Sequence, residues 1–382
     1  MLIGLALLFV PLLLWIAGQV PAWRARVTAL DGPGLAGIGP PAPVAASGRT
    51  VFNGDWQRYA DARFNYELPL RRPAVRATNQ LYYSAFHSSY MIGSSIVRGR
   101  GGQLMEREYI ADYCNHSREI FDDARFDRWA ADLKEIRTRV EARGQAFVYM
   151  ITPAKPAALP EAIPSRMPCL SPNAARPRYR AAIAALERAG LPYVDGSALV
   201  HQAMRGQPIR DYFTRGGTHW TVLSAATATG PLLDAIRYRN GQGAAPLHFT
   251  TQPGGAPSAV DTDLLDLANL WRRGPAYTVP VVNIQAAPAG TPRTLAAVGG
   301  SFVNQIMDIV AATGQFREMD YYYYFDTAHL RYPGRVHHPP SASDAYDALL
   351  KADVVLVEDN ETKMPSVHVG QLLDFLRRHP TP

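Results

Sequence analysis

Short apolar runs alternate with helix-like stretches along most of the chain after about residue 129. Trp129, Leu133, Ile136 and Val140 recur at the spacing of one helix face, and Gly144 follows them as a helix stop. Apolar runs typical of buried strands occupy residues 147–151, 191–194, 295–298 and 354–357, and helical stretches occupy 173–189, 222–236, 302–312 and 368–377. Repeated strand–helix units predict an α/β/α sandwich, in which helices cover both faces of a mostly parallel sheet.

The N-terminus carries a different signal. Residues 2–18 contain no charged side chain and are almost all apolar, and about 17–25 such residues span a bilayer. We expect residues 1–23 to be an uncleaved membrane anchor, with the core of a signal peptide as the alternative. The Gly-, Pro- and Ala-rich residues 24–49 predict a linker. Residues 50–105 predict a helical lead segment packed on the main domain, and residues 106–382 form that domain.

Two glycine-flanked stretches carry residues suited to acyl transfer. Ser301 follows an apolar run and two glycines at a strand-to-helix turn, where its hydroxyl is exposed and backbone N–H groups are near. His219 also follows two glycines and lies just ahead of a helix, so it can act as the general base for that serine. The alternatives are that Ser301 caps its helix and that His219 packs beside Trp220.

The sequence leaves open which residue orients the histidine. Asp211 is near enough to fold back onto His219, and Asp195 and Asp261 are further candidates. A Ser–His pair without any acid is the fourth possibility, since such sites retain weakened activity. Asn304, one helical turn after Ser301, has a side chain able to line an oxyanion pocket, with surface exposure or helix capping as the alternative.

These stretches resemble a known family. Residues 218–221 and 299–302 resemble the His and Ser blocks of the periplasmic alginate O-acetyltransferase family, within the SGNH-hydrolase superfamily. Its His block precedes its Ser block, the reverse of ordinary SGNH hydrolases. Four further stretches resemble blocks of the same family in the same order: 95–104, 151–156, 261–265 and 353–358. The chain departs from the family pattern at Gly217 and Gly300, where the family usually has aspartate.

The resemblance implies a membrane-anchored enzyme that faces the periplasm and acetylates hydroxyl groups of an exported polysaccharide. Ser301 would carry the acetyl group, with His219 as base and then acid. A membrane-embedded acyltransferase would deliver the acetyl group, and no cofactor or metal would be needed. An acetyl esterase of the same superfamily is one alternative, because sequence does not reveal whether a sugar or water reaches the acyl-enzyme. A non-catalytic polysaccharide-binding or scaffold protein of a secretion complex is the other, suggested by the acid missing at Gly217.

Composition narrows the range of partners. The 382 residues carry a formal net charge of +6, which suits an anionic partner such as an acidic polysaccharide or a membrane surface. No dense basic block or nucleic-acid motif accompanies this charge, so the sequence does not favour nucleic-acid binding. Cys114 and Cys169 form a disulfide if the chain is exported, or remain two buried thiols, and the chain has no zinc-type spacing.

Overall fold

The computed structural model describes residues 2–380 apart from 87–94, 170–175, 289 and 339–345. The chain divides into two compact units. Unit 1 comprises Met1–Arg98 and Leu264–Ala276, and unit 2 comprises Gly99–Asp263 and Tyr277–Pro382. Ser301, His219 and the three candidate aspartates therefore all belong to unit 2.

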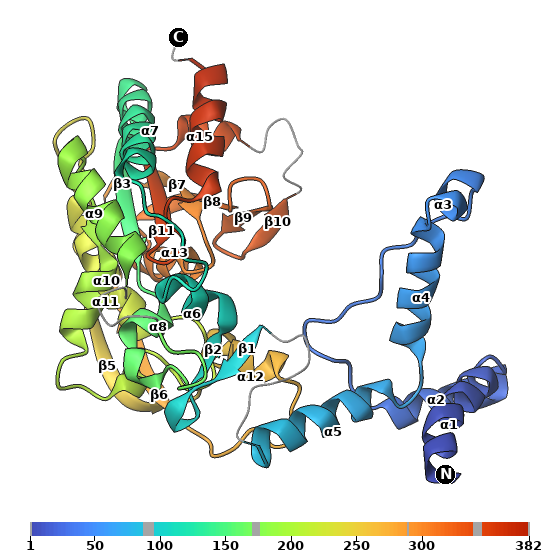
Figure 1. Ribbon diagram of the computed structural model, residues 1–382. Helices are drawn as coiled ribbons and strands as arrows, with labels where there is room; N and C mark the ends of the chain where they lie inside the picture. Colours follow the sequence, from blue (N-terminus) through green and yellow to red (C-terminus); the bar gives the residue numbers. More distant parts are fainter. Residues whose placement is uncertain (1, 87–94, 170–175, 289, 339–345, 381–382) are drawn as a thin grey trace. The chain divides into compact units, whose positions relative to one another are not determined.

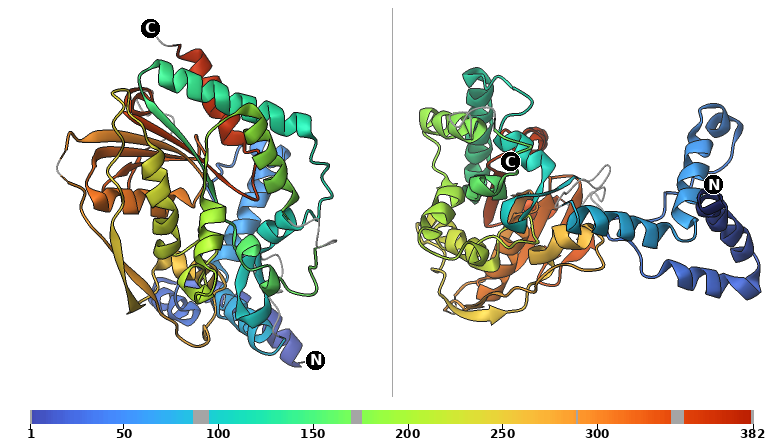
Figure 2. Two further views of the ribbon diagram at one scale, coloured as in Figure 1. Left: turned by 90° about the vertical axis from the view of Figure 1, so that its left-hand side faces the viewer. Right: turned by 60° about the horizontal axis from the view of Figure 1, so that its bottom comes forward.

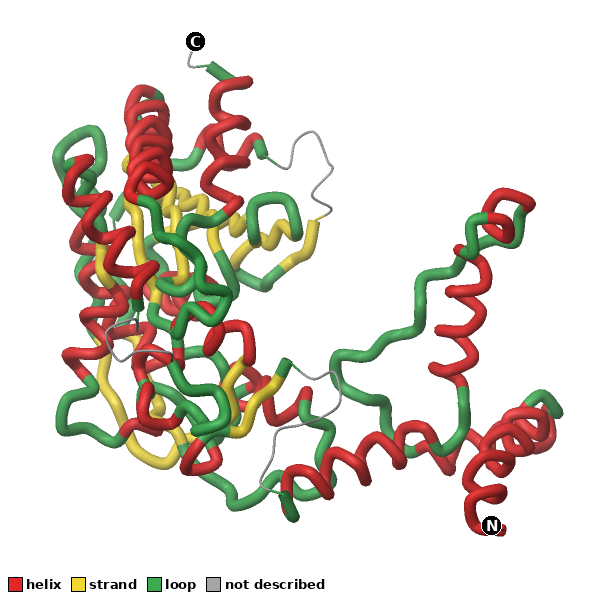
Figure 3. Tube along the Cα trace, in the orientation of Figure 1, coloured by secondary structure: helices red, strands yellow, loops and turns green. Residues whose placement is uncertain are grey.

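Unit 1 is mainly helical (Figure 3). Its elements are α1 (Leu2–Gly18), α2 (Pro21–Asp31), α3 (Gly48–Phe52), α4 (Asp55–Glu67), α5 (Arg71–Ser84) and the strand β1 (Ile96–Arg98). Polar side chains of α5 hold the neighbouring loops, because Arg76 donates to the Gly34 carbonyl at 2.7 Å and Asn79 donates to the Ala268 carbonyl at 2.9 Å. Residues 24–31, expected to begin a linker, complete α2, and the predicted lead segment contains α3 to α5.

The predicted anchor coincides with α1, which has 17 residues and contains Pro11. Large apolar side chains of α1 are exposed, among them Leu13 and Ile16. Across the described part of the chain, no helix combines the length and apolar character needed to cross a membrane.

A seven-stranded sheet forms the centre of unit 2 (Figures 1 and 2). The spatial order is β10 (Val336–His338), β9 (Ala328–Tyr332), β8 (Phe316–Tyr323), β7 (Arg293–Gly299), β11 (Val354–Asn360), β3 (Ala146–Thr152) and β4 (Val194–Asp195). The five strands from β8 to β4 run parallel, whereas β9 and β10 continue the edge in antiparallel pairs. The predicted mostly parallel sheet is confirmed.

Helices cover both faces of this sheet. On one face, α7 (Asp123–Ala142), α9 (Pro177–Ala189), α14 (Asp347–Lys351) and α15 (Val367–Arg378) share an apolar core with the sheet. On the other face, α11 (Val222–Ala235) contacts both α10 (Gly196–Ala203) and α13 (Val303–Thr313). Ala296 and Val298 of β7 belong to the first core, and Ala297 between them points to the other side, as strand geometry requires.

Smaller elements surround the sheet and build the site. They are η1 (Arg100–Gly102), β2 (Leu104–Glu106), α6 (Arg107–Tyr113), α8 (Lys155–Ala158), η2 (Pro160–Ala162), η4 (Ile209–Asp211), α12 (Ala259–Leu267) and the antiparallel pair β5 (Phe249–Gly255) and β6 (Val279–Ile284). Cys114, at the end of α6, is bonded to Cys169. Of the two alternatives that the sequence left open, a disulfide or two buried thiols, the structure contains the disulfide.

Candidate active site

His219 lies on a loop whose two ends are held together. Phe213 and Trp220 form an isolated antiparallel bridge, and Thr221 N–H donates to the Tyr212 carbonyl at 2.9 Å. The Thr221 hydroxyl also accepts from Ser224 N–H, which caps the start of α11. The loop therefore ends at a fixed helix start, and His219 is held two residues before the capping Thr221.

Lys155 supports the same loop from inside the protein. Its buried ammonium group donates to the carbonyl oxygens of Leu104 at 2.7 Å, Thr214 at 2.6 Å and Gly217 at 2.7 Å, with the Arg215 carbonyl further away at 3.5 Å. Burial lowers the pKa of Lys155 to about 7. The three closest carbonyls match the three N–H donors of an ammonium group, so Lys155 joins the loop before His219 to the start of β2.

An acid pairs with His219, and it is Asp263 of α12. His219 Nδ1 lies 2.5 Å from Asp263 Oδ2, while Asp263 Oδ1 accepts from Thr218 N–H at 2.8 Å. One carboxylate therefore fixes both the imidazole ring and the backbone beside it. Because a carboxylate only accepts, Nδ1 carries the proton and Nε2 is left as the free acceptor. Within the described residues, buried Nε2 has no hydrogen-bond partner.

The three aspartates predicted as candidates for this role are engaged elsewhere. Asp195 caps α10 by accepting from Ala198 N–H, and Asp261 accepts from the N–H and hydroxyl of Ser258. The Asp211 carboxylate oxygen Oδ1 lies 3.9 Å from Arg210 Nε. The prediction that one of them, or no acid at all, serves His219 is therefore wrong. The missed residue lies in the family-like stretch 261–265, two positions after one of the named candidates.

Gly217 explains why the acid comes from another element. A Cβ atom at this position would lie 2.4 Å from the carbonyl oxygen of Val260 and 3.1 Å from that of Asp261. The start of α12 thus occupies the space that a side chain two residues before His219 would need. The same helix carries Asp263. The close packing of α12 against Gly217 therefore also places the Asp263 carboxylate beside His219.

Ser301 lies in the turn between β7 and α13. The first residue outside α13 is Phe302, and no side chain caps this helix. The alternative that Ser301 serves as the helix cap is therefore wrong. Its hydroxyl makes no hydrogen bond among the described residues, and the same holds for the N–H groups of Ser301 and Phe302. The Asn304 amide donates to the Ser301 carbonyl at 3.0 Å, and its oxygen accepts from the Tyr332 hydroxyl at 3.2 Å.

Phe302 brings the two stretches together. Its ring centroid lies 5.0 Å from that of His219 and 5.9 Å from that of Trp220. Ser301 is the neighbour of Phe302 in the chain and follows the C-terminal end of a central parallel strand, where sites of such sheets gather. No hydrogen bond joins the Ser301 hydroxyl to His219 Nε2 in this structure.

A family model shows which family of known proteins this chain belongs to. The model described as SGNH hydrolase-like domain, acetyltransferase AlgX, matches residues 109–303, just over half of the chain. The chain belongs to this family. The matched range of this AlgX-type domain contains His219, Asp263 and Ser301. The recognised resemblance and the predicted SGNH-hydrolase-like α/β fold are thereby confirmed.

Curated relatives of the AlgX-type domain are named probable alginate O-acetylase AlgJ. The protein of Pseudomonas syringae pv. tomato is 26% identical over 203 residues, which cover 53% of this chain and 48% of the relative. That of Pseudomonas aeruginosa is 25% identical over 194 residues, covering 50% of this chain and 45% of the relative. The chain thus matches about half the length of these relatives.

Two solved structures are similar to this chain. The O-acetyltransferase domain of Pseudomonas putida AlgJ is 19% identical with a TM-score of 0.49, covering 74% of this chain and 99% of that domain. AlgX of Pseudomonas aeruginosa is 17% identical with a TM-score of 0.45, covering 78% of this chain and 70% of that protein.

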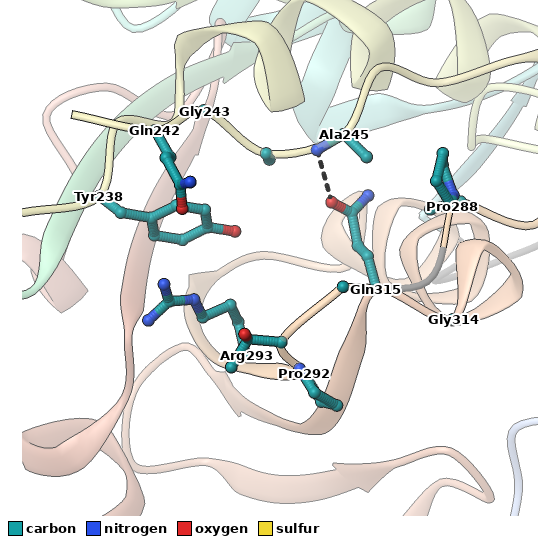
Figure 4. A pocket seen from close by; sticks show the side chains of 13 residues that line it. Tyr238, Gln242, Gly243, Ala245, Pro288, Pro292, Arg293, Gly314 and Gln315 are labelled. Atoms are coloured by element: carbon teal, nitrogen blue, oxygen red, sulfur yellow. Dashed lines mark hydrogen bonds between the residues drawn. The ribbon is translucent and has the colours of Figure 1, made fainter. Parts of the chain in front are cut away.

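A cavity of about 570 Å³ lies elsewhere in unit 2 (Figure 4). Arg293 and Tyr238 line it, with the guanidinium carbon 4.6 Å from the centre of the tyrosine ring. Gln315 closes another side by accepting from Ala245 N–H at 3.1 Å. Arg293 begins β7 whereas Ser301 follows its end, so this cavity lies at the opposite end of the strand from the candidate nucleophile.

Proposed function

We propose that this protein is an O-acetyltransferase that acetylates hydroxyl groups of an exported polysaccharide through an acetyl-Ser301 intermediate. The pairing of His219 with Asp263, which leaves Nε2 free beside the Ser301 turn, carries the proposal. A histidine held in this tautomer is what a serine nucleophile requires as its base. The names of the AlgJ relatives support a polysaccharide as the acetyl acceptor.

In the first half of the proposed reaction, the Ser301 oxygen attacks the carbonyl carbon of the acetyl donor, and His219 Nε2 takes the hydroxyl proton. Asp263 stabilises the imidazolium that forms. The N–H groups of Ser301 and Phe302 have no other partner among the described residues, so they are available to the oxyanion. The intermediate collapses, the donor leaves with the proton from His219, and acetyl-Ser301 remains.

The second half reverses these roles. A sugar hydroxyl gives its proton to His219 Nε2 and attacks the acetyl carbon. Ser301 leaves and takes the proton back, so an acetyl ester forms on the sugar and the free enzyme returns. An acetyl esterase would use the same residues with water as the acceptor. The reaction types therefore differ only in what reaches acetyl-Ser301.

The test of the proposed function is a comparison of acceptors. The purified full-length protein should release p-nitrophenol from p-nitrophenyl acetate, and added oligosaccharides should raise turnover and become acetylated. Unchanged turnover with acetate as the sole product would identify an esterase. Absence of both turnover and an acetylated protein, together with binding of the oligosaccharide, would favour the scaffold alternative. Mass spectrometry of the protein and the sugar distinguishes all three outcomes.

We propose further that the protein acts in the periplasm, attached to the inner membrane by residues 1–23, and receives acetyl groups from a membrane-embedded acyltransferase. The Cys114–Cys169 disulfide supports this location, because such bonds persist in oxidising compartments. External protease should digest residues after about 50 in spheroplasts. Protection until the spheroplasts are lysed would place the domain in the cytoplasm and contradict this location.

A further inference from the structure

Glu358 reaches the nucleophile turn from β11, the strand between β7 and β3. Its side chain is fully buried, and Oε2 accepts from Gly300 N–H at 2.8 Å. Oε1 accepts from the Thr152 hydroxyl of β3. The residue before Ser301 therefore has its amide fixed by a carboxylate from an adjacent strand, and the same carboxylate is tied to a third strand.

The approach of Glu358 depends on the absence of a side chain at Gly299. A Cβ atom there would lie 2.6 Å from Glu358 Oε2 and 2.8 Å from Glu358 Cβ. The Tyr321 hydroxyl bonds to the Gly300 carbonyl, and Tyr324 N–H donates to the Gly299 carbonyl at 2.9 Å. Polar groups of the Gly299–Gly300 backbone are thus held from two sides, by β11 and by β8.

We propose that the ionised Glu358 carboxylate is the positioning residue of the nucleophile turn. This inference rests on the proposed function of Ser301. By engaging Gly300 N–H, Glu358 removes that amide from the oxyanion site and fixes the peptide that carries Ser301. The next two amides, of Ser301 and Phe302, remain available for the reaction. A protonated carboxyl has one fewer acceptor position, so the two bonds weaken when Glu358 binds a proton.

The surroundings allow Glu358 to titrate near neutral pH. Burial raises its pKa to about 7, against the bonds from Thr152 and Gly300, which lower it. Charged neighbours are Asp359, which raises the pKa of Glu358, and His368 of α15, which lowers it. The other titratable groups that act on this carboxyl are Tyr109, Tyr149, Tyr321 and Tyr324, whose pKa values burial raises, so they stay neutral.

The variant Glu358→Gln keeps an oxygen for Gly300 N–H but has no charge to titrate. Acetylation of Ser301 by p-nitrophenyl acetate should be measured in a single turnover from about pH 5 to about pH 9. In the wild type, protonation of Glu358 should add a loss of about tenfold as the pH falls through about 7, so the logarithm of the rate should fall more steeply there than in the variant. In Glu358→Gln this additional fall should be absent. The rate at high pH should be about tenfold lower than in the wild type, since a bond to a charged acceptor is lost, and the two rates should converge at acid pH.

Asp359→Asn is the matched control. Asp359 is also fully buried but faces the other side of β11, where it accepts from Tyr149 at 2.9 Å. It should keep the steeper fall of the wild type, displaced to lower pH because Asp359 raises the pKa of Glu358. The second variant, Thr152→Val, removes the hydroxyl that lowers the pKa of Glu358 and should move the acid limb to higher pH. A wild-type slope in Glu358→Gln, or equal changes in Glu358→Gln and Asp359→Asn, would overturn the inference.

Thermal unfolding separates this inference from the proposed function. Because the pKa of Glu358 is raised in the folded protein, its contribution to stability is full at low pH and is lost as pH rises from its ordinary range through about 7. The Tm of Glu358→Gln relative to wild type should therefore rise between about pH 5 and about pH 8. A pH-independent difference would overturn the titration of Glu358. Absence of acetyl-Ser301 in the wild type would instead overturn the proposed function, and the positioning role with it.

Discussion

Replacing Ser301 with alanine should reduce the turnover of p-nitrophenyl acetate to the uncatalysed background. Removal of either the nucleophile or the base from a Ser–His site lowers kcat by about 10⁶-fold, and His219→Ala should act as strongly as Ser301→Ala. The double variant should be no slower than either single variant, because the two residues work in the same step. Steady-state release of p-nitrophenol measures all three.

His248→Ala is the matched control for these variants, since His248 is an exposed histidine of the same unit. It should keep wild-type turnover. Equal unfolding temperatures of the variants and the wild type would show that the losses are chemical. Retention of turnover in Ser301→Ala would remove Ser301 from the mechanism.

Asp263→Asn should lower turnover by about 10⁴-fold, because an amide can hold His219 in the wrong tautomer and cannot stabilise an imidazolium. The effect is expected in kcat rather than in KM, since Asp263 contacts His219 and Thr218. Asp263→Glu, which keeps the carboxylate, should recover part of the rate. The downfield proton resonance of His219 Nδ1–H should be present in the wild type and absent in Asp263→Asn.

Asp211→Asn tests the specificity of that loss. Asp211 is closer to His219 in the sequence than Asp263 is, but its carboxylate faces Arg210. Its replacement should leave the rate unchanged. A larger loss in Asp211→Asn than in Asp263→Asn would contradict the pairing of His219 with Asp263.

Local patterns predicted most of the fold. The apolar run 295–298 became β7 and 354–357 became β11, and the helices expected at 222–236 and 302–312 correspond to α11 and α13. Hydrophobic periodicity is a property of neighbouring residues, which is why these elements were found. The aromatic stretch 321–325 begins within β8, which ends at Tyr323. Tyr324 and Phe325 both adopt positive φ values and turn the chain. Nothing about two aromatic residues in the sequence indicates that the backbone will turn there.

The sequence predicted only those parts of the site that neighbouring residues in the chain define. Ser301 and His219 each lie among glycines at the start of a helix, and this is visible in the sequence. The acid was missed because Asp263 is 44 residues from His219 and reaches it through the packing of α12 against Gly217. Glu358 is likewise brought to Gly300 by strand pairing of β11 with β7. Contacts of this kind follow from the fold and not from spacing along the chain.

The most direct test of the central claim is to find the acetyl group itself. The full-length protein should be quenched during turnover of p-nitrophenyl acetate and mapped by peptide mass spectrometry. We expect one acetyl group on the peptide that contains Ser301, lost when an oligosaccharide acceptor is added before quenching and absent from Ser301→Ala. An acetyl group on another residue, or its persistence in Ser301→Ala, would contradict transfer through Ser301.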